Sequence, residues 1–129
     1  MPVFFIKREY FDALERGEKK AEIRLGKLWY RIAEKIKSGE IRPIAIFKCG
    51  RKRFVLKISR IGIYQTLKAA LRRKRWKKLG LKAPTYKAAI NEIKKLYHSS
   101  STRPAIIFWL SREGVPEEKK QERSGKEQH

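Results

Sequence analysis

The chain has 129 residues, a length typical of one domain, and its 34 Lys and Arg against 13 Asp and Glu give a formal charge of +21. Hydrophobic residues make up 41% of it, but no apolar run reaches the roughly 20 residues of a membrane span, so we expect no membrane partner. One cysteine excludes an internal disulfide and a cysteine-based zinc cluster, and the 2 histidines have no carboxylate cluster beside them, so we expect no metal and no cofactor. The expected compartment is a reducing cytoplasm.

The first part of the chain predicts strands and helices in alternation. Residues 3–7 form a short apolar strand, and 9–16 form a helix that Gly17 ends, as glycine often does. Alternating side chains predict a strand over 20–25. Apolar residues at helical spacing then predict a helix over 29–36.

A hairpin and a basic helix are expected next. Residues 43–48 and 53–64 read as two strands joined by a turn at 49–52. Thr66 is a suitable N-cap for a helix that continues through Leu71 toward Trp76.

The last elements are a helix capped by Thr85 and a buried strand at 105–110, which we expect to close the sheet as a central strand. The order of elements predicts an α+β fold, in which a small twisted sheet or incomplete barrel of about five to six strands is flanked by helices. We expect a single domain over 1–111 and a charged, disordered tail over 112–129.

The positive charge belongs to the predicted domain rather than to the tail. Residues 112–129 hold five basic and five acidic side chains, whereas 1–111 hold 29 basic and 8 acidic ones. A domain this basic repels itself, and a polyanion relieves the repulsion. The composition, rich in Lys, Arg and Glu with one Cys and one Met, is also typical of thermophile proteins, and we expect a hyperthermophilic or archaeal source.

Three groups of cations are candidates for nucleic-acid contacts. They are Lys19, Lys20 and Arg24; Lys48, Arg51, Lys52 and Arg53; and the run Arg72, Arg73, Lys74, Arg75, Lys77 and Lys78, which Trp76 interrupts. In that run the cations neutralise phosphates and Trp76 stacks on a base, or the run is a solvated helix end with Trp76 packed inward. The 48–53 group reaches a nucleic acid, or it is a charged turn that discourages strand pairing.

Glu22 and Arg24 are two residues apart, so they share one face of the 20–25 strand and are expected to pair. Together with Lys19 they form a polar cleft that recognises a phosphate or a base edge. The alternative is an ordinary surface salt bridge of about 0–1 kcal/mol.

Several motifs together resemble the ASCH family, whose fold is PUA-like. Residues 17–24 resemble its G-x-K-x-x-E-x-R signature, and 10–14 fit the helix that precedes it. Further likenesses are the Ser-Gly-Glu of 38–40 before a strand, a strand at 61–64 that ends in Tyr, and the closing strand at 105–108. The resemblance spans about residues 3–110 and suggests a stand-alone ASCH domain.

The resemblance implies RNA binding in a cleft next to the signature. One bacterial branch of the family resembles an amidohydrolase acting on N4-acetylcytidine, which uses a Lys and a Thr of this motif and a later Glu. Lys19 matches that Lys, but Glu22 stands at the Thr position, and no carboxylate occurs near Lys82 or Ala83, where the later Glu is expected.

We therefore predict a non-catalytic module that binds structured or single-stranded RNA, with DNA as a less favoured partner. The alternative is a hydrolase acting on RNA or a nucleoside, with Lys19 as base or nucleophile and Glu22 as its acid–base partner. A third interpretation is a basic structural subunit of a ribonucleoprotein.

Overall fold

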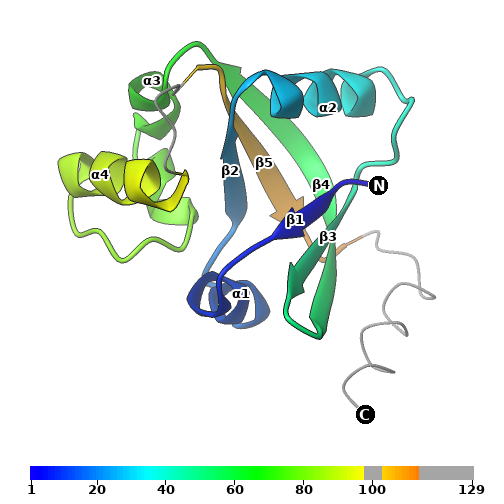
Figure 1. The fold of residues 1–129 in the computed structure, drawn as a ribbon, viewed down its shortest axis with the longest axis horizontal. Coiled ribbons are helices and arrows are strands. Elements are labelled where there is room, and N and C mark those ends of the chain that lie inside the picture. Colours follow the sequence, from blue (N-terminus) through cyan, green and yellow to red (C-terminus); the bar gives the residue numbers. More distant parts are fainter. Residues whose placement is uncertain (98–102, 114–129) are drawn as a thin grey trace.

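Strands and helices alternate along residues 1–97 and 103–113, the part of the chain that the computed structural model describes. These residues form β1 (Val3–Phe5), α1 (Arg8–Glu15), β2 (Ala21–Leu25), α2 (Lys27–Lys37), β3 (Ile44–Cys49), β4 (Lys52–Tyr64), α3 (Leu67–Leu71), the short 3₁₀ helix η1 (Arg75–Lys78), α4 (Tyr86–Tyr97) and β5 (Ala105–Ser111) (Figure 1). Each predicted strand is present within two residues of its expected bounds.

All five strands belong to one curled sheet with the order β1-β3-β4-β5-β2. Only β1 and β3 are parallel, and the other neighbours are antiparallel. Arg24 of β2 donates from Nη2 to the carbonyl oxygen of Phe5 in β1 at 3.0 Å, so a side chain links the two edge strands. The curled sheet with its flanking helices confirms the predicted α+β class.

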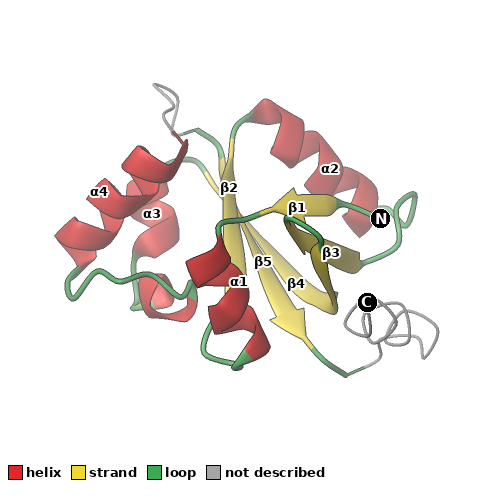
Figure 2. Ribbon diagram, turned by 60° about the horizontal axis from the view of Figure 1, so that its bottom comes forward, coloured by secondary structure: helices red, strands yellow, loops and turns green. Residues whose placement is uncertain are grey.

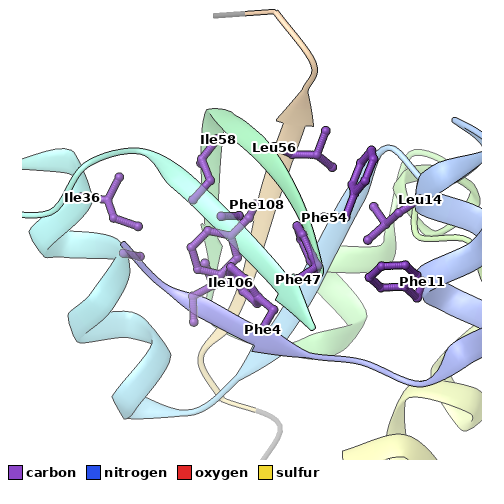
Figure 3. Packing of buried hydrophobic residues seen from close by; sticks show 12 residues of the cluster. Phe4, Phe11, Leu14, Ile36, Phe47, Phe54, Leu56, Ile58, Ile106 and Phe108 are labelled. Atoms are coloured by element: carbon purple, nitrogen blue, oxygen red, sulfur yellow. The ribbon is translucent and has the colours of Figure 1, made fainter. Parts of the chain in front are cut away.

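The two faces of the sheet are covered by different helices (Figure 2). On one face α1 and α2 pack over an aromatic core, in which the Phe4 ring stacks on Phe47 at 5.0 Å and meets the edge of Phe108 at 5.1 Å (Figure 3). On the other face α3 and α4 pack over the strand residues Ala21, Ile23, Ala105 and Ile107.

Strand β5 is apolar because both of its faces are buried. It lies between β4 and β2, with Ile106 and Phe108 on the side of α1 and α2 and with Ala105 and Ile107 on the side of α3 and α4. The prediction of a buried strand inside the sheet is therefore confirmed. Because Glu22 pairs with Phe108 in register, its side chain enters the aromatic side of the sheet.

The predicted helix from Thr66 toward Trp76 is shorter than expected. Helix α3 ends at Leu71, and the next residues leave the helix, with Arg73 at φ 56° and Lys74 at φ 61° before η1 begins. A continuous helix would set six cations on neighbouring turns with no carboxylate between them, and like charges at that spacing are destabilising. In the structure the helix ends at Leu71 instead, and Arg72, Arg73 and Lys74 lie in the turn before η1.

Candidate functional site

Glu22 carries a carboxylate into the apolar interior. Only 3% of its surface is exposed. Its Oε1 accepts a hydrogen bond from the Lys19 ammonium at 2.9 Å, and its Oε2 accepts from the Arg24 guanidinium at 2.7 and 2.8 Å. The predicted contact between Glu22 and Arg24 is confirmed, and the pair is largely shielded from solvent, with 12% of the Arg24 side chain and 4% of the Glu22 side chain exposed.

Two effects oppose each other at the Glu22 carboxyl group. Burial raises its pKa because the charged form loses hydration, whereas the charges and hydrogen bonds of Lys19 and Arg24 lower it. The lowering prevails, so the pKa of Glu22 is below its usual value. Glu22 is therefore a carboxylate at neutral pH and a poor proton donor there.

Lys19 lies in the segment between α1 and β2, and 5% of its surface is exposed. Besides its contact with Glu22, its Nζ donates to the carbonyl oxygen of Leu79 at 2.6 Å. Gly80 packs against its stem so closely that a Cβ on Gly80 would lie 2.9 Å from the Lys19 Cβ. Lys19 thus joins the signature motif to the end of η1.

Arg24 is held between aromatic rings. Its guanidinium carbon lies 5.2 Å from the ring centres of both Phe4 and Trp29 and 5.7 Å from that of Tyr97. Cation–π contacts of this kind favour a planar guanidinium over an ammonium. Arg24 therefore contributes to the packing of the protein as well as to the candidate site.

A cavity of about 360 Å³ lies beside these three charged residues. Its wall is made by the end of β1, the start of α1, β2, the residues after η1 and the last turns of α4. The polar groups on it are Lys7, Tyr10, Lys19, Glu22, Arg24 and Tyr97, and apolar side chains form the rest. Phe5, with 71% of its surface exposed, also lines this cavity.

A carboxylate of α4, that of Glu92, lies beside Lys82 and Ala83. Glu92 accepts from the backbone N–H of Lys82 at 3.0 Å and of Ala83 at 2.9 Å, and from the Tyr10 hydroxyl at 2.7 Å. Burial and the negative charge of Glu92 raise the pKa of Tyr10, so this hydroxyl stays protonated. Glu92 fastens the segment after η1 to α1, and sequence spacing gave no sign of this.

The basic run and α4 together line a second, wider hollow, which we call the basic groove. It has a volume of about 880 Å³ and lies between α3, the turn before η1, and α4. Its cations are Lys68, Arg72, Arg73, Lys74, Lys87 and Lys94. The other lining residues are Trp76, Tyr86, Ile90 and Asn91, so among the described residues no carboxylate lines it.

Arg75 does not line the groove. Its Nε donates to the carbonyl oxygen of Ala70 and its Nη2 to that of Ala69, both at 2.7 Å, and its guanidinium lies 4.6 Å from the Tyr64 ring centre. Arg75 thus satisfies the last carbonyls of α3, which is a common use of a cation at a helix C-terminus.

The fold is shared with solved archaeal proteins. The chain is similar to the crystal structure of hypothetical protein PH0355, with a TM-score of 0.62 and 17% identity over 85% of this chain and 96% of that one. It is also similar to the solution structure of protein PF0455 from Pyrococcus furiosus, with a TM-score of 0.58 and 13% identity over 89% of this chain and 100% of that one. No family model and no curated protein matches the sequence. These likenesses concern the fold alone.

The remaining predicted cations lie on the surface. Lys77 and Lys78 of η1 are exposed, and so is Lys20, whose backbone N–H donates to the Lys78 carbonyl oxygen at 2.7 Å. Arg51 and Lys52 are exposed at the tip of the β3–β4 hairpin, while Lys48 and Arg53, which form the second residue pair from the turn, are half-buried. In Figures 1 and 2, α1 lies between this hairpin and the α3–α4 pair, so the hairpin is separate from the groove.

Six groove residues were not predicted from the sequence, namely Lys68 of α3 and Tyr86, Lys87, Ile90, Asn91 and Lys94 of α4, although α4 carries a signal for three of them. Lys87, Asn91 and Lys94 follow one another at intervals of four and three residues, which places them on one face of a helix. In the described residues no three His, Cys, Asp or Glu side chains gather as a metal site would require, and no helix there is long and apolar enough to cross a membrane.

Proposed function

We propose that this protein binds nucleic acid, and RNA in particular, through the basic groove. The observation that carries this proposal is the lining of the groove, in which the described residues supply six cations, from α3, α4 and the turn between α3 and η1, and no carboxylate. Such a surface has a positive potential over its whole width, and phosphates neutralise it on binding.

The ion pairs of the protein support this reading. Five close pairs join acidic and basic side chains in the described residues, and their cations are Arg8, Arg16, Lys19, Arg24 and Lys82. None of these five lines the groove. The acidic residues of these pairs, Glu9, Asp12, Glu18 and Glu22, thus neutralise cations outside the groove.

RNA is favoured over DNA because residues 17–24 resemble the ASCH signature and the family's PUA-like fold is associated with RNA. The curled five-stranded sheet is compatible with that fold. In this proposal the cavity beside Lys19, Glu22 and Arg24 recognises a base or nucleotide, and its exposed Phe5 is open to a ligand. Phosphate contacts in the groove supply most of the affinity, and the cavity supplies the preference for a particular base or nucleotide.

We favour binding over hydrolysis because the two candidate catalytic groups are already engaged. Glu22 has a cation on each oxygen, and Lys19 donates to Glu22 and to Leu79. A base or nucleophile needs a free lone pair directed at the substrate, and a general acid needs a proton to give.

Fluorescence anisotropy with a labelled RNA tests the proposal. The variant Arg72→Gln/Arg73→Gln/Lys74→Gln removes three groove cations and leaves Arg75 in place. Its control, Arg31→Gln/Lys35→Gln/Lys37→Gln, removes the same charge from exposed positions of α2. We expect the groove variant to bind far more weakly and to lower the slope of log K against log salt by about two, since each contact with a single strand contributes about 0.7. Equal weakening by both variants would overturn the proposal.

A further inference from the structure

The floor of the basic groove differs chemically from its rim. The cations Arg72, Arg73, Lys74, Lys87 and Lys94 are exposed, whereas Trp76 and Tyr86 are half-buried and Ile90 is buried. A nucleic acid in this hollow therefore meets charge at the edges and aromatic or apolar surface beneath.

The two aromatic side chains on the floor are held in place. Tyr86 donates from its hydroxyl to the carbonyl oxygen of Lys68 at 2.7 Å, which ties α4 to α3. Trp76 packs against the buried cluster under α3 and α4, and the Lys77 ammonium lies 5.6 Å from its ring centre. Rings fixed before binding lose little conformational freedom when a base stacks on them.

This arrangement distinguishes a single strand from a duplex. In a duplex the bases are stacked on one another, and the outer surface offers mainly phosphates and sugars, which reach the rim but make no use of an aromatic floor. A single strand offers phosphates together with unpaired bases, and a charged groove with aromatic side chains is the usual way in which proteins bind it. Asn91, exposed among the cations, adds a neutral amide that both donates to and accepts from a base edge.

We propose that the basic groove is a binding site for single-stranded RNA, with phosphates on the rim cations and unpaired bases against Trp76 and Tyr86. The proposal rests on the proposed function and makes it more specific, because it assigns the groove to an unpaired strand. Helices α3 and α4, which lie side by side in Figures 1 and 2, then form the two sides of the binding site.

The test compares an unstructured RNA with a blunt RNA duplex of equal length, each titrated by anisotropy over a salt series. Two pairs of variants are used with the wild type. Lys87→Gln/Lys94→Gln removes two cations from the groove, and Lys35→Gln/Lys37→Gln removes two from α2. Trp76→Phe keeps an aromatic ring, whereas Trp76→Leu keeps only apolar bulk. Circular dichroism melting confirms that each variant is folded.

We expect the wild type to bind the single strand at least tenfold more tightly than the duplex. Lys87→Gln/Lys94→Gln lowers the salt slope for the single strand by about 1.4, and the α2 control changes it by less. Trp76→Leu weakens single-strand binding by about tenfold, as loss of one stacked base does, while Trp76→Phe restores most of it.

The outcomes separate the two proposals. If neither RNA binds, or if α2 and groove variants behave alike on both, the proposed function and this inference both fall. If the duplex binds as tightly as the single strand, or if Trp76→Leu and Trp76→Phe bind equally, RNA binding stands and the assignment to an unpaired strand is overturned.

Discussion

The ammonium of Lys19 donates to the carbonyl oxygen of Leu79 at 2.6 Å, and this bond joins the signature-like motif to the basic segment. The next residue repeats the link, since the Lys20 N–H donates to the Lys78 carbonyl oxygen at 2.7 Å. Trp76, which lies in η1 with Lys78, lines the basic groove, whereas Leu79, the residue after η1, lines the cavity. The two candidate surfaces therefore share one wall.

Because Gly80 packs against Lys19 in this shared wall, we predict that Gly80→Ala is more destabilising than Gly17→Ala. Both glycines have positive φ, 71° and 79°, so alanine at either costs about 1–2 kcal/mol of backbone energy. Only at Gly80 does the added methyl group meet another residue, the Lys19 side chain, and overpacking of this kind costs about 1–3 kcal/mol more. Chemical denaturation of both variants measures the difference, and equal losses would show that Lys19 moves aside freely.

Removing the Glu22 charge is predicted to destabilise the fold strongly. Glu22→Gln leaves the buried Lys19 and the half-buried Arg24 without their counter-charge, and the breaking of buried pairs typically costs about 3–5 kcal/mol. The exposed pair of Arg16 and Glu18 provides the control, since Glu18→Gln is expected to change stability very little. Urea denaturation at pH 7 compares the two variants.

The contribution of the Glu22 charge to the free energy of unfolding also has a predictable pH dependence. Its folded-state pKa is lowered, so its contribution is complete above the unfolded value of about 4.3 and is lost as the pH falls through the lower folded value. The difference in unfolding free energy between wild type and Glu22→Gln is therefore constant from pH 7 to about 5 and shrinks below about 4. A difference that grew on acidification would contradict the lowered pKa.

The fold was predicted well for elements whose pattern of apolar and polar residues is contained within the element itself. Strand β5 is apolar on both faces because helices cover both, and its continuous run from Ala105 to Leu110 already indicated burial. The run from Arg72 to Lys78 was predicted as a helical continuation because its residues individually favour helices. What ends the helix is collective, namely repulsion among the cations and the hydrogen bonds of Arg75 to α3, and neither is visible residue by residue.

Within this run, Arg75 and Arg73 are predicted to act differently. Arg75→Gln removes two charged hydrogen bonds to the end of α3 and is expected to cost about 2 kcal/mol of stability. Arg73→Gln removes an exposed cation from the groove rim, so it weakens RNA binding and leaves the melting temperature unchanged. Thermal melting and anisotropy on both proteins check this, and the reverse pattern would contradict the division of roles.

RNA recognition in the cavity is tested with a substitution of Phe5 rather than of Arg24. Arg24→Ala removes a half-buried cation that contacts Glu22 and Phe5, so any change in RNA preference would be mixed with a loss of stability. Phe5→Ala alters an exposed side chain on the cavity wall. We expect it to reduce the discrimination between RNAs of different sequence about fivefold, in keeping with one lost stacking contact, and to leave stability unchanged. Uniform weakening on all RNAs would count against recognition in the cavity.

The C-terminal segment is predicted to contribute little to affinity. Residues 114–129 hold four basic and four acidic side chains, so their deletion changes no net charge. Arg112 is kept because it donates to the carbonyl oxygens of Leu14 and Glu15 and lies 4.9 Å from the Phe54 ring centre. A protein ending at Glu113 should bind RNA within about twofold of the full chain, and a tenfold loss would show that the segment takes part in binding.

The candidate site was only partly predictable. Lys19, Glu22 and Arg24 were found as a candidate polar cleft because they lie within six residues of one another, but their spacing did not show how far they are buried. Their burial depends on Leu79, Trp29 and Tyr97, which come from distant elements. Glu92 likewise reaches Tyr10 across 82 residues of sequence. Contacts of this range are set by the packing of α1 and α4 against the sheet.

The most direct test of RNA binding is a comparison of three ligands on the wild-type protein. Single-stranded RNA, a hairpin RNA and duplex DNA of equal length are titrated by anisotropy from low to high salt. We predict that the single-stranded RNA binds most tightly at every salt concentration and that part of its advantage remains at high salt, where phosphate contacts alone are weak. Equal binding of all three ligands that vanishes with salt would contradict the account, because it would reduce the +21 charge to unspecific attraction for polyanions.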